Sequence, residues 1–232
     1  CVGDVSDTLA HLLRLGLGTF EWVAADFDAV RTTIDSALQP PRALRGLSGY
    51  EVTRKLRALC PRNTIFTTDV GSVKMVTTQA WRCFEPATFL VSNGLSAMGY
   101  SVPAAMAARL SHPDRPVLCT VGDGGFAMTI AELETCVRER LTLTIVVFND
   151  SSLSLIDVAQ QRRGYPTTGV RFAPVDFAAT ARGFGAWARR AETMDELVAA
   201  IRDAPAQGPA VIDAIIDPAE YARQTAGHRV TP

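Results

Sequence analysis

Short apolar runs alternate with stretches of helix-like spacing along most of this chain. Residues 117–126 and 142–151 each begin with a β-branched, apolar run that stops abruptly at an acidic or amide residue. Between them, residues 128–138 have helical spacing, so the unit is predicted to be strand, loop, helix and strand. A right-handed crossover of this kind makes the two strands parallel and brings both strand ends to one edge of a sheet.

The same alternation continues on both sides of this unit. Two helices are predicted to open with capping boxes, Ser48 with Glu51 and Thr193 with Glu196. The pattern predicts further strands at 64–68, 88–91, 186–190 and 209–216, and further helices from 48 to Pro61, at 72–81, from Ser101, and at 152–163, 176–182 and 193–202. This alternation predicts an α/β fold, a doubly wound, mostly parallel sheet with helices on both faces.

The N-terminal region does not fit the start of this fold. Helices are predicted at 4–15 and 26–38, with a short strand between them, before the break at Pro40-Pro41. A chain that opens in mid-pattern is expected of a truncated protein or a proteolytic fragment. We therefore expect residues 1–40 to be the C-terminal end of a preceding central α/β domain, 41–47 to be a linker, and 48–232 to be the main domain.

Composition narrows the possible functions. The net charge of −1 gives no electrostatic reason to expect nucleic acid or an anionic membrane as a partner. No apolar run reaches the roughly 18 residues of a membrane span, and the N-terminus lacks the pattern of a signal peptide. Five scattered cysteines without a C-x-x-C pair favour a reducing compartment. We therefore expect a cytoplasmic protein.

Two acidic residues at the predicted ends of strands, Asp123 and Asp150, are the candidate ligands of a metal ion. The glycines of residues 122–125 let a backbone approach a diphosphate closely, and the following helix offers unpaired N–H groups. Asp123 within this segment would repel a phosphate unless a cation lay between them. Asp123 and Asp150, with the backbone carbonyl of Ser152, can supply oxygen ligands to Mg²⁺. The pattern therefore predicts a Mg²⁺ ion that holds a phosphorylated ligand.

Two other interpretations of these residues stay open on sequence grounds. Gly-Asp-Gly and Asn-Asp-Ser are also ordinary turn sequences, so each alone could be structural. The residues Gly122-x-Gly124-x-x-Ala127 also match the dinucleotide fingerprint, which predicts a nicotinamide-binding oxidoreductase domain. Asp123 counts against that fingerprint, because it would face a pyrophosphate that the nicotinamide fold binds without metal.

The motifs of the chain together resemble those of one enzyme family. Gly122-Asp-Gly-Gly, followed after 24 residues by Asn149-Asp150, resembles the G-D-G…N-N signature of thiamine-diphosphate enzymes. Residues 92–105 are similar to the segment that holds the aminopyrimidine in that family, Asp69-Val-Gly71 to its D-x-G turn, and 176–185 to its D-F…F-G element. The resemblance covers about residues 46–220. It implies the pyrophosphate-binding domain of an enzyme of the acetolactate-synthase group.

The resemblance also implies the residues of the site. Mg²⁺ would be bound by the side chains of Asp123 and Asp150 and by the carbonyl of Ser152. The backbone of Met98 would accept a hydrogen bond from the aminopyrimidine, and Met128 would hold the cofactor in its bent shape. The full set implied to contact thiamine diphosphate is Gly71, Ser72, Ser96, Met98, Gly122, Gly124, Gly125, Met128 and Asn149. Both methionines are also consistent with simple core packing.

This sequence departs from the family pattern at two positions. Asp150 stands where the family usually has a second Asn, although the flavin-independent catabolic acetolactate synthases also have Asp there. Val73 stands where relatives often have His or Gln, which weakens any inference about the substrate.

The implied activity is decarboxylation and carboligation of a 2-keto acid, with pyruvate the first expectation. The catalytic residue of this chain is unknown, because the family's activating glutamate comes from a separate pyrimidine-binding domain. Glu132 and Glu134 fall inside the predicted crossover helix, and Glu51 caps another. We therefore expect this chain alone to be catalytically incomplete, and the full-length protein to be a homodimer or homotetramer. A non-catalytic homologue that serves as a dimerisation or regulatory module is the remaining alternative.

Overall fold

The computed structural model describes residues 4–16, 18, 21, 23–39 and 46–224, and its contacts divide the chain into two compact units, 1–39 and 40–232. The first unit contains helices α1 (Val5–Arg14) and α2 (Ala24–Leu38), and neither buries a residue. The short strand expected between these helices falls on a segment that lies partly outside the described residues. Pro40-Pro41 lies wholly outside them.

The second unit is built on one six-stranded parallel sheet with the strand order β2-β1-β3-β4-β6-β5. Its strands are β1 (Ile65–Thr68), β2 (Phe89–Val91), β3 (Val117–Gly122), β4 (Leu143–Asn149), β5 (Trp187–Ala191) and β6 (Pro209–Ile215). The central strands are buried almost throughout, as expected for a parallel sheet with both faces covered. The predicted doubly wound α/β fold is confirmed.

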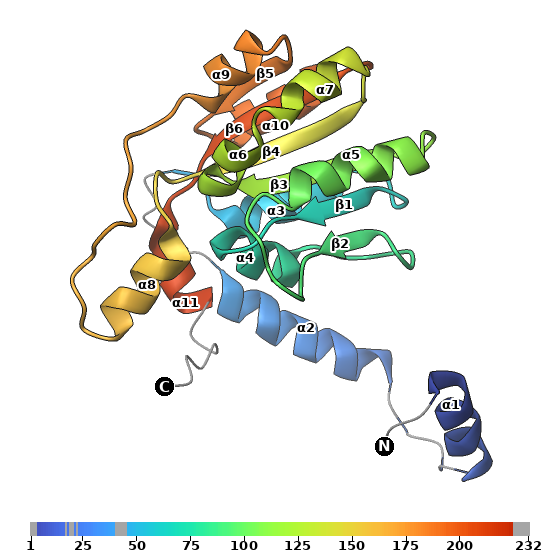
Figure 1. Ribbon diagram of the computed structural model, residues 1–232. Coiled ribbons are helices and arrows are strands. Elements are labelled where there is room, and N and C mark those ends of the chain that lie inside the picture. Colours follow the sequence, from blue (N-terminus) through green and yellow to red (C-terminus); the bar gives the residue numbers. More distant parts are fainter. Residues whose placement is uncertain (1–3, 17, 19–20, 22, 40–45, 225–232) are drawn as a thin grey trace. The chain divides into compact units, whose positions relative to one another are not determined.

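Helices cover both faces of this sheet (Figure 1). The helices of this unit are α3 (Gly49–Leu59), α4 (Ser72–Ala80), α5 (Ser101–Ser111), α6 (Asp123–Thr129), α7 (Glu132–Arg138), α8 (Ser154–Arg162), α9 (Phe177–Gly183), α10 (Met194–Asp203) and α11 (Tyr221–Gln224), with a 3₁₀ turn, η1 (Pro218–Glu220). Helices α5, α6, α7 and α9 pack on the face that carries the main core cluster, and α3, α4 and α10 lie on the other face. Among the described helices, none is both long and apolar enough to cross a membrane.

The crossover between β3 and β4 differs from its prediction in one respect. The glycine-rich segment is not a loop, because α6 begins at Asp123, directly after β3. The helix then breaks at residues 130–131 and resumes as α7. Asp123 Oδ1 accepts the N–H of Gly124 at 2.7 Å, which satisfies a donor that the first turn of α6 leaves without a helical partner.

The start of α3 corrects the first of the two predicted capping boxes. Ser48 Oγ accepts the N–H of Glu51 at 3.1 Å, but Glu51 does not return the bond and its side chain is exposed. Its place is taken by Glu220 of η1, which accepts the N–H of Tyr50 at 3.1 Å and the hydroxyl of Ser48 at 2.6 Å. The second capping box, Thr193 with Glu196, is confirmed.

We predict that Glu220→Ala lowers the free energy of unfolding by about 2 kcal/mol, because it leaves buried donors of the α3 start without an acceptor. Glu51→Ala is the matched control and should change stability by no more than about 0.5 kcal/mol, as is usual at an exposed position. Urea unfolding followed by circular dichroism measures both. Equal losses in the two variants would contradict the assignment of the cap to Glu220.

Candidate functional site

A cavity of about 260 Å³ opens at the carboxyl edge of the sheet. The chain leaves β1 to form β2 on one side and returns to form β3 on the other, so the order reverses between β1 and β3. Segments that follow β1, β3 and β4 line the cavity, together with the start of α8 and Tyr221 of α11. Open α/β sheets bind ligands at such a reversal point, because the strand ends and the loops after them diverge there.

The two predicted acidic residues lie next to each other in this cavity. Asp123 Oδ2 accepts the backbone N–H groups of Asp150 at 3.0 Å and Ser151 at 2.7 Å. Asp150 turns its own carboxylate back onto the chain, where it accepts from the Ser152 N–H at 3.0 Å and the Ser154 hydroxyl at 2.7 Å. The sequence offered no structural reason for Asp123. The structure provides one, because its carboxylate joins the end of β3 to the turn after β4.

The electrostatics of this pair favour a bound cation. Burial raises the pKa of Asp123 to about 6, against backbone hydrogen bonds that lower it. The pKa of Asp150 is raised to about 7, mainly by burial and secondly by the nearby negative charge of Asp123. Among the described residues, no third His, Cys, Asp or Glu joins them in a metal-binding group. A cation here would therefore rely on two carboxylates and on backbone or ligand oxygens, which suits Mg²⁺ better than zinc.

Unsatisfied hydroxyls on the cavity wall fit a phosphate-bearing ligand. Ser72 Oγ and Ser152 Oγ are buried and have no hydrogen-bond partner, and both residues line the cavity. Ser72 is the first residue of α4 and follows Gly71, whose φ of +87° is a backbone conformation that favours glycine. Buried polar atoms without a partner are rare in proteins, so these two hydroxyls suit a ligand with acceptor oxygens.

The three glycines at the end of β3 and the start of α6 differ in the space around them. A Cβ on Gly125 would lie 2.0 Å from Asp69 Oδ2, whereas a Cβ on Gly122 would meet only Val73 Cγ1, at 3.9 Å. At Gly124, a Cβ would come within 3.1 Å of Met98 Cε and 3.0 Å of the Leu153 side chain. The requirement at Gly125 therefore comes from the protein itself.

Asp69 fixes the position of the segment before α5, which lines part of the cavity. Its buried carboxylate accepts the N–H of Gly99 at 3.0 Å and of Ser101 at 3.3 Å, and so fixes the segment before α5 to the end of β1. This anchor places Met98 on the cavity wall, while Ser96 contributes to the same wall with a φ of +50°. Such backbone strain in a residue other than glycine is often found at functional sites.

Comparison with known families identifies the family of this chain. Residues 69–214, more than half of the chain, match the family described as "Thiamine pyrophosphate enzyme, C-terminal TPP binding domain". The chain belongs to this family. The resemblance stated from the motifs is thereby confirmed, and thiamine pyrophosphate, also called thiamine diphosphate, is the cofactor of the family.

Similar proteins agree with this family. The chain is 33% identical over 168 residues to acetolactate synthase of Bacillus subtilis (strain 168), a match that covers 72% of this chain and 30% of the relative. It is 36% identical over 188 residues to acetolactate synthase isozyme 1 large subunit of Escherichia coli (strain K12), covering 78% and 33%. The chain thus spans about a third of the length of these relatives.

A solved structure has the same fold. The thiamine diphosphate-dependent 4-hydroxybenzoylformate decarboxylase of Rhodococcus jostii RHA1 superposes with a TM-score of 0.71 at 20% sequence identity. The match covers 77% of this chain and 34% of that one. With this family assigned, the dinucleotide interpretation of residues 122–127 has no support beyond its glycine spacing.

The cavity of this thiamine pyrophosphate enzyme domain brings together most of the predicted site. The predicted residues that line it are Gly71, Ser72, Ser96, Met98, Gly122, Asp123, Gly124, Gly125, Asp150 and Ser152. Two others do not line it. The side chain of Met128 is 66% exposed on α6. The amide of Asn149 points instead to Asp213 and to the carbonyl of Val175.

Several residues of the site and its support were not predicted from the sequence. Tyr221 and residues 153–156 line the cavity, and Asp213 is fully buried behind it. A signal was present for Asp213, since it interrupts the apolar strand β6 at a position that a two-sided parallel sheet must bury. Tyr221 gave no such signal, because its place depends on how the chain folds back after β6.

We predict that Gly125→Ala lowers the free energy of unfolding by about 3 kcal/mol, because the new Cβ displaces Asp69 and its two backbone hydrogen bonds. Gly122→Ala is the control, and its cost should stay within about 1 kcal/mol because the space beside it is open. Chemical denaturation measures both values. If Gly125→Ala were as stable as Gly122→Ala, the close packing of Asp69 on α6 would be wrong.

Proposed function

We propose that this domain binds thiamine diphosphate through a Mg²⁺ ion and serves the decarboxylation and carboligation of a 2-keto acid. One observation carries the proposal. Two carboxylates at the ends of adjacent parallel strands share one cavity, inside the segment that matches the thiamine pyrophosphate family. Carboxylates placed there without a cation would repel the diphosphate, whereas Mg²⁺ between them would attract it.

Each part of the cavity has a distinct role in this proposal. Asp123, Asp150 and the backbone carbonyl of Ser152 hold the metal ion. The free hydroxyls of Ser72 and Ser152 donate to diphosphate oxygens, and the N–H groups at the start of α4 face the same region. The wall formed by Met98 orients the aminopyrimidine. When bound, the cofactor supplies the electron sink for cleavage of the bond next to a keto group, and the protein supplies orientation and electrostatics.

The preferred substrate in this proposal is pyruvate. Two similar proteins are named acetolactate synthases, which supports a small 2-keto acid. Val73 lies buried on the cavity wall and offers no polar group to a functionalised substrate side chain. A small apolar substituent next to the keto group suits such a wall.

The proposed reaction needs an activating glutamate from another domain. No glutamate lines the described cavity, and Glu132 and Glu134 are exposed on α7. We propose that a pyrimidine-binding domain, in a second subunit of a homodimer or homotetramer, supplies this group. In this arrangement residues 1–40 end a central domain, 41–47 are a linker, and 48–232 form the pyrophosphate-side domain.

The binding prediction is tested by calorimetry on this chain. Thiamine diphosphate should bind in the presence of Mg²⁺ and not in the presence of a chelator. Asp123→Asn should abolish this metal-dependent binding, because it removes the charge that draws Mg²⁺ to the strand ends. Asp114→Asn, a neutralisation at an exposed turn, is the matched control and should bind as the unaltered chain does. Metal-independent binding of NADH, with none of thiamine diphosphate, would contradict the proposal.

The catalytic prediction concerns turnover of 2-keto acids. This chain with Mg²⁺ and thiamine diphosphate should release no CO₂ from pyruvate, because its cavity lacks the activating glutamate. The longer protein that includes the pyrimidine-binding domain should be active, and fastest on pyruvate among a panel of 2-keto acids. Turnover by this chain alone would overturn the assignment of the glutamate to another domain.

A further inference from the structure

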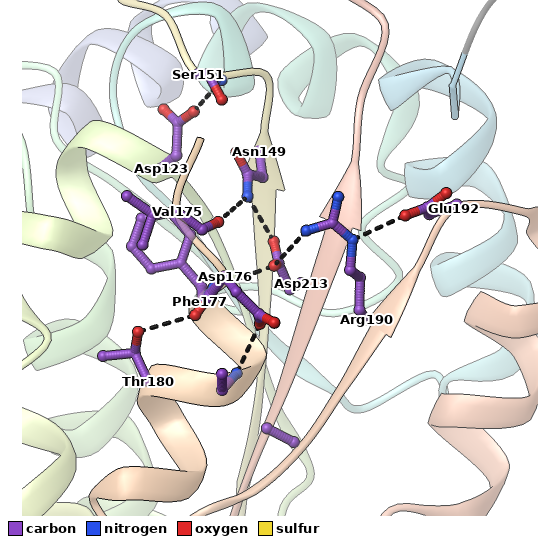
Figure 2. Close-up of polar contacts among 12 residues, drawn as sticks. Asp123, Asn149, Ser151, Val175, Asp176, Phe177, Thr180, Arg190, Glu192 and Asp213 are labelled. Carbon is purple, nitrogen blue, oxygen red and sulfur yellow. Dashed lines mark hydrogen bonds and ion pairs between the residues drawn. The ribbon is translucent and has the colours of Figure 1, made fainter. Parts of the chain in front are cut away.

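A buried carboxylate lies behind the cavity without touching it. Asp213 of β6 is fully buried, on a strand whose other residues are all apolar. Figure 2 shows its polar contacts. Burial raises its pKa, and its nearest cation, Arg190, is 3.9 Å away and 40% exposed. Apolar side chains would fill this position at lower cost in desolvation than a carboxylate does. Its presence therefore calls for a role that an apolar side chain could not perform.

The first contact of Asp213 reaches the turn after β4. Asp213 Oδ1 accepts from Asn149 Nδ2 at 2.9 Å, and the same amide donates to the Val175 carbonyl at 3.0 Å. The two bonds fix the orientation of the Asn149 side chain, which lies at the last position of β4. Asp150 follows immediately, and its N–H bonds to Asp123. The orientation of Asn149 therefore limits how the acidic turn can leave the sheet.

The second contact reaches the other half of the site. Asp213 Oδ2 accepts the N–H of Phe177 at 3.1 Å, at the start of α9. The ring of Phe177 packs edge-on against Phe126, with ring centroids 5.4 Å apart. Phe126 is fully buried in α6, the helix that begins with Asp123. One carboxylate is thus connected to both strand ends that carry the acidic pair.

We propose that Asp213 is a positioning residue for the metal site, which holds the turn after β4 through Asn149 and the start of α6 through Phe177. The metal function itself rests on the function proposed above. The role of Asn149 changes accordingly: its side chain supports Asp150 from behind the cavity and does not cradle the diphosphate.

The test compares two changes from acid to amide near the start of α9. Asp213→Asn keeps the shape of the side chain but has one acceptor oxygen in place of two, so either the Asn149 amide or the Phe177 N–H loses its acceptor. Asp176→Asn is the control, because the Asp176 side chain accepts the Ala179 N–H at 2.7 Å at the exposed cap of α9, a bond that the amide oxygen of Asn can keep. The quantity measured is the Mg²⁺ concentration that gives half-maximal binding of thiamine diphosphate, with thermal unfolding in chelator recorded in parallel.

We expect Asp213→Asn to raise that Mg²⁺ concentration about 10-fold or more, as is typical when a group that supports a metal ligand is lost. Asp176→Asn should stay within about 2-fold. Asn149→Ala removes the bond between Asn149 and Asp213 from the other side and should give a similar increase. If both residues act through one bond, the double variant should show less than the sum of the two effects. Lower melting temperatures with unchanged Mg²⁺ dependence in both single variants would overturn the proposal.

A second measurement needs no ligand. Hydrogen exchange of the Asp150 and Ser151 amides, both bonded to Asp123, reports the position of the turn in chelator. Asp213→Asn should speed their exchange about 10-fold relative to Asp176→Asn, and equal rates would refute the positioning role. If the unaltered chain binds no thiamine diphosphate, the proposed function fails, and the exchange rates still decide whether Asp213 positions the turn.

Discussion

The contact between the carboxylate of Asp123 and the turn after β4 is the interaction on which the site depends. It joins the ends of two neighbouring parallel strands through the N–H groups of Asp150 and Ser151. The same carboxylate stabilises the first turn of α6 through Gly124. One side chain thus joins the ends of β3 and β4, stabilises the start of α6, and carries a charge available to a metal ion.

This arrangement places like charges close together in a poorly solvated cavity. Asp123 and Asp150 both have raised pKa values, and Asp69 and Asp213 are buried nearby on either side, with raised pKa values of their own. Backbone N–H groups and the Asn149 amide offset much of the desolvation of Asp69 and Asp213. A divalent cation would relieve the repulsion of the central pair. In the proposed function, the fold thus holds an acidic pair whose repulsion a bound Mg²⁺ ion would offset.

Local sequence patterns were sufficient for the architecture and for the centre of the site. Every predicted strand of the main sheet is present within one or two residues at each end. The central strands β3, β4 and β6 are buried almost throughout and have nearly continuous apolar runs, as is typical of parallel strands with both faces covered. The acidic pair was predicted to meet because strand direction is fixed by the crossover rule. The family could be recognised from one sequence because its motifs are short runs of adjacent residues, such as Gly122-Asp-Gly-Gly, and the family match confirmed it.

The sequence by itself determined the parallel sheet, the helices on both faces and the meeting of Asp123 with Asp150. Only the tertiary structure decided which distant side chains bond to these local elements. Glu220 accepts a hydrogen bond from Ser48, 172 residues earlier in the chain, and so replaces Glu51 at the start of α3. Asp213 accepts a hydrogen bond from the amide of Asn149, 64 residues earlier. The physical reason is that hydrophobic periodicity and helix caps are local properties of the chain. The partner of a buried polar group is set by which segments pack together, and a one-dimensional pattern does not contain that information.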